Sequence, residues 1–212
     1  MLNFSDFFTA CTGIWKTERI YHSILQGEIE RSYTQYQVTP LAEAQKQQML
    51  SLPLDGLKID TALLNSKEAI YPGFAIAFDT VSETGEQVSM SLKALFIPDA
   101  YATDETATPL PPLPSAAQIS PTEELIQGFY LRDEGYSEAG AVKSRFTYLP
   151  SRQTLEMTTY YRNSVAVDQM RMVAPNLRAR TIITYQRPDT NTMPTIIDLI
   201  GFGVERREPL ET

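Results

Sequence analysis

Most of the chain shows a two-residue alternation of apolar and polar positions that is typical of half-buried β-strands. Phe74, Ile76 and Phe78, for example, alternate with alanines, so one face of that strand carries the bulky side chains. In the second half, segments rich in Ile, Val, Tyr and Thr follow one another with short breaks at residues 126–137, 141–149, 153–162, 165–173, 177–186 and 195–208. Consecutive strands with short connections predict an antiparallel sheet in a sandwich or barrel.

The first half mixes helices with strands. Phe7, Phe8 and Cys11 recur at helical spacing, which predicts a short helix over residues 4–12 that is capped by Ser5. Residues 40–52 are rich in helix-forming side chains and predict a second helix. Strand-like segments occupy residues 14–24, 29–38, 57–64, 73–81 and 88–97. The fold class is therefore all-β with short helices.

Residues 98–121 differ from the rest because they hold six of the 14 prolines of the chain. This composition predicts an extended surface loop or a partly disordered insertion. The run "PLPPLP" at residues 109–114 also fits a ligand for an aromatic groove, but a loop stiffened by proline is the simpler interpretation.

Composition narrows the class of protein. The chain has 212 residues, of which 42% are hydrophobic, so residues 1–212 can form a single domain with one substantial core. The formal net charge of −8 argues against nucleic acid and anionic membranes as partners. We find no apolar run long enough for a membrane span and no signal-peptide pattern. One cysteine fits a reducing compartment, and one histidine leaves little for a metal site.

Two arginines are conspicuous in this acidic chain. Arg178 and Arg180 lie two residues apart in a predicted strand, so their side chains point to the same face. If that face lines a barrel, the guanidinium groups suit a ligand with carboxylates. If it faces solvent, they are ordinary surface charge. Asp168, an acid in an apolar strand, is either a general acid or the partner of a neighbouring arginine.

Three single residues receive simpler interpretations. Trp15, the only tryptophan, is interpreted as a core plug where the helix meets the barrel. His22 is interpreted as a surface or hydrogen-bonded residue, although histidine in general can act as an acid or base near neutral pH. Cys11 is interpreted as a small buried hydrophobe. A Ser-His-Asp or Cys-His site cannot be placed, because the one histidine would have to serve it.

Four motifs, in order along the chain, resemble those of the S/U-type (CpcS/CpeS-like) phycobiliprotein lyases. The family pattern G-x-W-x-S-x-R-T-T-H-H is similar to Gly13, Trp15, Thr17, Arg19 and His22, with Ser23 in place of the second histidine. L-R-x-x-G-Y-x-E is matched by Leu131, Arg132, Gly135, Tyr136 and Glu138. P-N-L-R-x-R-T is matched by Pro175, Asn176, Leu177, Arg178, Arg180 and Thr181, and F-x-x-E-x-R by Phe202, Glu205 and Arg207.

The resemblance implies a fold and an activity. The fold is a lipocalin-like or fatty-acid-binding-protein-like antiparallel barrel of about ten strands with the N-terminal helix at one mouth. The activity is that of a chromophore lyase, which attaches a phycobilin through a thioether to a cysteine of a phycobiliprotein subunit. Phycocyanobilin or phycoerythrobilin would be a bound substrate, not a built-in cofactor, and an apo-phycobiliprotein subunit would be the partner. The expected location is the cyanobacterial cytoplasm near phycobilisomes, or the plastid stroma of an alga.

The resemblance also assigns roles. Arg178 and Arg180 would hold propionates, and Asp168 would lie near the pyrrole nitrogens, so these three are the expected catalytic residues. The expected bilin-binding residues are Trp15, Arg19, His22, Tyr160, Asn176, Arg178, Arg180 and Glu205. Tyr160 and Arg162 replace an acidic pair of the family, and Asp168 is one methylene shorter than the family glutamate.

Other hypotheses stay open. The protein is alternatively a non-catalytic bilin-binding chaperone, a partner subunit of a heterodimeric lyase, or a carrier of fatty acids or other carboxylates in the same barrel. A homodimer and a heterodimer with a related lyase are both compatible with the resemblance.

Overall fold

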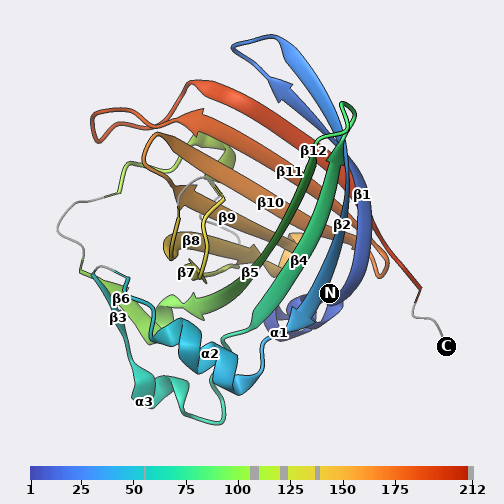
Figure 1. Cartoon of the computed structure of the whole chain (residues 1–212). Coiled ribbons are helices and arrows are strands. Elements are labelled where there is room, and N and C mark those ends of the chain that lie inside the picture. The colour runs from blue at the N-terminus through green and yellow to red at the C-terminus, as the bar shows by residue number, and fades with distance from the viewer. Residues whose placement is uncertain (55, 106–109, 120–123, 137–138, 210–212) are drawn as a thin grey trace.

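The computed structural model of the protein is a closed antiparallel β-barrel (Figure 1). It describes residues 1–54, 56–105, 110–119, 124–136 and 139–209. Within these ranges ten strands close the barrel in the order β1-β12-β11-β10-β9-β8-β7-β5-β4-β2, which confirms the predicted fold class. The strands are β1 Gly13–Ser23, β2 Glu28–Pro40, β4 Gly73–Ser82, β5 Gln87–Pro98, β7 Ile126–Arg132, β8 Val142–Leu149, β9 Thr154–Tyr160, β10 Ser164–Ala174, β11 Leu177–Gln186 and β12 Ile197–Arg207.

The alternation of side chains along each strand decides what lies inside the barrel. On β2, Tyr36 and Val38 are buried, while Gln35 before Tyr36 and Gln37 between the two are exposed. The same pleat places Arg178 and Arg180 of β11 on one face, and that face lines the interior. The two arginines are therefore not surface charge.

Helix α1 (Phe4–Ala10) fills one end of the barrel (Figure 1). Its three phenylalanines are buried, and Phe8 lies 4.6 Å from Phe96 of β5 between ring centroids. The side chain of Asn3 accepts a hydrogen bond from the Asp6 backbone N–H at 2.8 Å. The predicted helix is present and begins at residue 4, but it ends at Ala10 and not at residue 12. Its N-cap is Asn3 and not Ser5, because Asn3 stands directly before the first helical residue.

A small outer layer covers the barrel wall beside β4, β5 and β7. It contains α2 (Glu43–Leu50), β3 (Leu57–Ile59), α3 (Thr61–Leu64) and β6 (Ala102–Asp104), and β3 pairs with β6. The prediction of a strand over residues 57–64 holds only for its first three residues. Asp60 ends the strand and caps α3, since its side chain accepts a hydrogen bond from the Leu63 N–H at 3.0 Å.

The proline-rich segment lies against the outer face of the barrel where the structure describes it. Its short 3₁₀ turn η2 (Ser115–Ala117) packs on β10 and β11, with Ala117 buried beside Val165 and Tyr185. Gln169 of β10 donates a hydrogen bond to the Ala116 carbonyl at 2.8 Å. The predicted surface loop is therefore packed against the barrel over these residues, while residues 106–109 and 120–121 of it lie outside the described ranges.

Two further observations concern the described part of the chain. None of its helices is long and apolar enough to cross a membrane. None of its His, Cys, Asp and Glu side chains gather in groups of three or more that could hold a metal ion.

Candidate functional site

The barrel interior holds a cavity of about 280 Å³, towards the end of the barrel opposite α1. The deeper interior, towards α1, retains only about 10 Å³ of free space because core side chains fill it. Charged, aromatic and aliphatic side chains from both walls line the larger cavity: Arg19, Tyr21, Tyr36, Ile76, Phe78, Thr80, Val88, Tyr136, Asp168, Arg180 and Ile182.

A buried ionic network lies beneath this cavity. Glu205 of β12 stands opposite Arg178 of β11, and its carboxylate accepts a hydrogen bond from Arg178 Nε. The same carboxylate accepts hydrogen bonds from the Tyr36 hydroxyl at 2.8 Å and from Arg19 Nη2 at 3.3 Å. Arg178 also stacks on Trp15, with 4.2 Å between its Cζ and the ring centroid. These contacts hold Arg178 and Glu205 at 1% and 0% exposure.

A second ion pair forms part of the cavity wall. Arg180 of β11 donates from Nε to Asp168 Oδ1 at 2.9 Å and from Nη2 to the other oxygen, so the pair is bidentate. Both side chains keep some exposure, 11% for Arg180 and 19% for Asp168. Arg180 Nη1 has no hydrogen-bond acceptor among the described residues. The pair therefore retains a donor for a ligand.

Two glycines of β12 make room for side chains of the neighbouring strand β1. A Cβ at Gly201 would lie 2.6 Å from the ring of Tyr21, and a Cβ at Gly203 would lie 3.2 Å from Arg19 Cγ. Neither contact leaves room for a larger residue. Tyr21 and Arg19 can consequently lie over β12, where the Tyr21 hydroxyl accepts a hydrogen bond from Arg19 Nη1 at 3.1 Å.

The electrostatics of the site favour an anionic ligand. Burial by itself would raise the pKa of Glu205, but the guanidinium groups of Arg178, Arg180 and Arg19 outweigh it and hold the pKa below its ordinary value. Burial would lower the pKa of Arg180, but Asp168 and then Glu205 raise it well above its ordinary value. The formal charges of these three arginines and of the Glu205 and Asp168 carboxylates sum to one excess positive charge, in a chain whose formal net charge is −8.

Six of the nine expected site residues lie at the cavity or below it. Arg19, Asp168 and Arg180 line the cavity, while Arg178 and Glu205 lie directly beneath it. Trp15 is fully buried below them and donates from Nε1 to the Cys11 carbonyl at 2.9 Å, so it is the core plug that its isolation in the sequence suggested.

The other expected residues lie away from the cavity. His22 is on the outer face of β1 and stacks on Phe202, with ring centroids 5.8 Å apart. Tyr160 lies under the proline-rich segment on the outer face of β9 and donates to the Pro111 carbonyl at 3.1 Å. Asn176 is exposed in the turn between β10 and β11. These three positions do not agree with the expectation that His22, Tyr160 and Asn176 contact a ligand in the barrel. Glu138, from the second motif, lies outside the described residues.

Several residues that line the cavity were not among the expected site residues. Tyr36 and Tyr21 could have been found by parity, since they share the inward faces of their strands with Val38 and Arg19. Tyr136 belongs to a motif but lies on a loop, so no periodicity shows that its ring enters the barrel.

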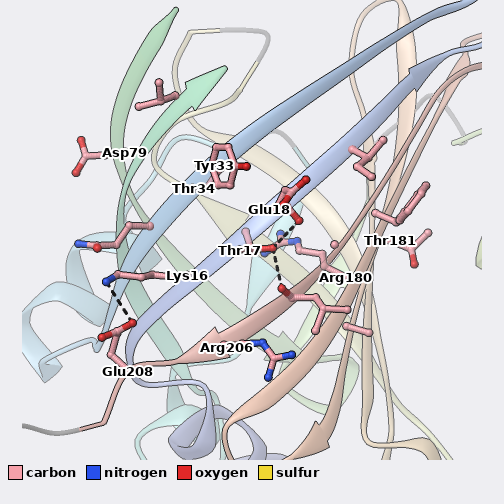
Figure 2. A pocket seen from close by; sticks show the side chains of 17 residues that line it. Lys16, Thr17, Glu18, Tyr33, Thr34, Asp79, Arg180, Thr181, Arg206 and Glu208 are labelled. Atoms are coloured by element: carbon pink, nitrogen blue, oxygen red, sulfur yellow. Dashed lines mark hydrogen bonds and ion pairs between the residues drawn. The ribbon is translucent and has the colours of Figure 1, made fainter. Parts of the chain in front are cut away.

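The outer surface also has a wide concavity of about 1090 Å³, over β1, β2, β4, β11 and β12 (Figure 2). Tyr33, Val81 and Val204 expose apolar surface in it, and Lys16 pairs with Glu208 at 3.2 Å. It carries charges of both signs (Figure 2), and most of them are exposed, namely Lys16, Glu18, Asp79 and Arg206. The inner cavity, in contrast, has partly buried charges held in fixed geometry, which is the arrangement that orients a small ligand.

Comparisons with known proteins agree with this architecture. A family model described as "CpeS-like protein" matches residues 3–108 and 115–208. The protein named chromophore lyase CpcS/CpeS 1, from Synechococcus sp. (strain JA-3-3Ab), is 35% identical over 204 residues, which cover 96% of each chain. The S-type phycobiliprotein lyase CPES from Guillardia theta shares the fold, with a TM-score of 0.64 and 17% identity over 99% of this chain and 95% of that one. The extent of the family match and the 35% identity show that the chain belongs to the CpeS-like family.

Proposed function

We propose that this protein binds a phycobilin in the barrel cavity and attaches it through a thioether to a cysteine of a phycobiliprotein subunit. The name of the Synechococcus relative, a chromophore lyase, supports this reaction class. The observation that carries the proposal is the excess of positive charge around an otherwise apolar cavity. A bilin has that chemistry, since it combines a long conjugated system with two propionates.

Within this proposal we give the arginines different roles. Arg180 binds a propionate through Nη1 while its other nitrogens stay on Asp168, and Arg19 supplies the neighbouring positive charge. Arg178 does not reach the cavity, so it is a positioning residue that holds Glu205 and, through it, Arg19 and Tyr36. This replaces the expectation of two arginines side by side on the propionates.

Asp168 is the group that stabilises the positive charge of the protonated bilin. Its carboxylate is partly exposed in the cavity wall, where it can balance the positive charge of a protonated pyrrole system. A protonated bilin is a better electrophile at ring A. The partner thiol then adds to the ethylidene carbon of ring A, the thiol proton ends on the ring carbon of the former double bond, and no atom leaves.

The thiol must come from the partner. The single cysteine, Cys11, is 1% exposed beneath the ionic network, and burial raises the pKa of its thiol. The cavity is also slightly smaller than common ligand pockets of about 300–1,000 Å³. A bilin bound by its propionates therefore leaves one end at the open mouth, where a cysteine of another protein can reach it.

Absorption titration tests the binding step. Phycocyanobilin and phycoerythrobilin, added to the purified protein, should each be examined for a red-shifted band. Arg180→Gln should weaken binding by about 10- to 100-fold, because a hydrogen bond to a charged group contributes about 1.5–3 kcal/mol. Arg145→Gln is the matched control, since Arg145 pairs with Asp99 at 2.6 Å on the outer face. A protein that binds oleate but gives no bilin band would be a carboxylate carrier instead.

A further inference from the structure

Arg132, at the end of β7, is a buried arginine with unusual surroundings. Its side chain points into the barrel and is 1% exposed, although a guanidinium group stays charged at neutral pH. Three tyrosine rings surround its Cζ, with centroids at 4.5 Å for Tyr136, 5.4 Å for Tyr130 and 5.8 Å for Tyr161. Its Nη2 donates to the Tyr161 hydroxyl at 2.6 Å.

What Arg132 lacks is a carboxylate. In the described ranges no acidic side chain forms an ion pair with it, and its buried Nε has no hydrogen-bond partner. Arg178 and Arg180, by contrast, each hold a carboxylate in the same barrel. An uncompensated buried charge is costly, and aromatic rings offset that cost only in part.

Tyr136 separates this charge from the ligand cavity. Its ring covers Arg132 on one side and lines the cavity, and its centroid lies 6.3 Å from the ring centroid of Phe78 of β4. The residue follows the end of β7 in a connecting segment and is 50% exposed. A side chain on a connecting segment with this exposure can turn away without disturbing the barrel wall.

We propose that Arg132 is a second carboxylate-binding residue, which a propionate of the bound bilin reaches when the Tyr136 ring turns aside. This inference rests on the proposed function and adds to it. Arg132 brings a second excess positive charge to the cavity, so a ligand with two carboxylates neutralises the site, one group at Arg180 and one at Arg132. A monocarboxylate such as a fatty acid would leave one of them unpaired.

Affinities of two ligands for three proteins test the assignment. The ligands are phycocyanobilin and its dimethyl ester, in which both propionates are masked. The proteins are the parent, Arg132→Gln and the outer-face control Arg145→Gln. We expect Arg132→Gln to weaken binding of the diacid by about 10- to 100-fold. Binding of the diester should change by no more than about twofold, as for uncoupled changes, and the control should leave both affinities unaltered.

The possible failures are distinguishable. If the parent binds no bilin, the proposed function and this inference both fail. If the parent binds bilin and Arg132→Gln weakens both ligands equally, or neither, then only this inference fails and Arg132 has a structural role.

A measurement on the parent covers the case in which Arg132→Gln does not fold. The Nε–H proton of Arg132, assigned through its contacts with the surrounding tyrosine rings, can be followed by NMR. A carboxylate on this nitrogen should move the resonance downfield when the diacid is added and not when the diester is added. If the chemical shift of this proton does not change when the diacid is added, in a sample whose absorption shows bound bilin, the inference is overturned.

Discussion

Replacing Glu205 by Gln should destabilise the barrel strongly. The Glu205 carboxylate is fully buried and accepts hydrogen bonds from Arg178, Arg19 and Tyr36. Gln keeps the size but removes the charge, which leaves Arg178 buried at 1% exposure without a counterion. Breaking a buried ion pair in this way costs about 3–5 kcal/mol. That is a large share of the roughly 5–15 kcal/mol by which domains are stable.

Urea denaturation at pH 7 measures the effect, since a stability change moves the midpoint without changing the slope. For a chain of this size the same loss lowers the melting temperature by about 6–20 °C. Glu208→Gln is the control, because Glu208 pairs with Lys16 at 3.2 Å on the surface, with side chains 41% and 54% exposed. Exposed pairs contribute at most about 1 kcal/mol. Equal midpoints for the two variants would refute the assignment of a stabilising network to Glu205.

The pH dependence gives an independent check. The network holds the pKa of Glu205 below its value in the unfolded chain, which is about 4.3. The stability from this carboxylate is therefore fully present above about pH 5 and is lost as the pH falls through the folded-state pKa. The stability difference between parent and Glu205→Gln should be constant from pH 6 to 8 and should shrink below about pH 4. A difference that grows in acid would contradict the proposed ionisation.

Three further variants test other parts of the structure. Glu156 is buried on the outer face of the barrel, where burial raises its pKa to about 7, so its carboxyl costs stability progressively from about pH 4.3 to 7. Glu156→Gln should raise the free energy of unfolding at pH 8, measured in urea, by up to about 3 kcal/mol. It should leave that free energy unchanged at pH 4, and an equal effect at both pH values would count against this. Gly201→Ala should destabilise by about 1–3 kcal/mol in thermal melts and weaken bilin binding, because its Cβ would lie 2.6 Å from the Tyr21 ring. A neutral effect of Gly201→Ala on both would mean that Tyr21 is not confined there. Asp168→Asn should still bind bilin, with a blue-shifted band and about 10²-fold slower transfer, whereas an unchanged spectrum and rate would remove Asp168 from the mechanism.

The barrel was predictable because a two-residue period records which side chains face inward. The alternation in residues 73–81 and 177–186 corresponds to β4 and β11. The misses occur where local hydrogen bonding competes with periodicity. Asp60 turns an apolar run into a strand followed by a helical turn, and Asn3 caps α1 in place of Ser5. Short apolar runs do not distinguish these outcomes.

The site was predictable only in part, because periodicity gives the face of a residue and not its depth. Arg178 and Arg180 share a face, yet Arg178 pairs in the core with Glu205, directly opposite it on β12. Arg180 pairs in the cavity wall with Asp168, its diagonal neighbour on β10. These pairings join residues far apart in sequence, and no local pattern contains them.

The alternation of side chains along a strand does separate two of the expected site residues. Arg19 and His22 are three residues apart on β1, so they must point to opposite faces, and only Arg19 enters the cavity. The motif that holds both residues does not show this. Arg132 and Tyr136 became candidates only through the cage of rings that the fold builds around them.

Covalent attachment in a reaction of purified components tests bilin transfer most directly. The protein, a bilin and each candidate apo-phycobiliprotein subunit are mixed, and the products are separated on a denaturing gel, where only covalently bound colour stays with the subunit. We expect a coloured subunit band that forms faster, and at fewer cysteines, than with bilin alone. The same rate and the same products with and without the protein, for every subunit, would contradict transfer and leave a bilin-binding or partner-subunit role.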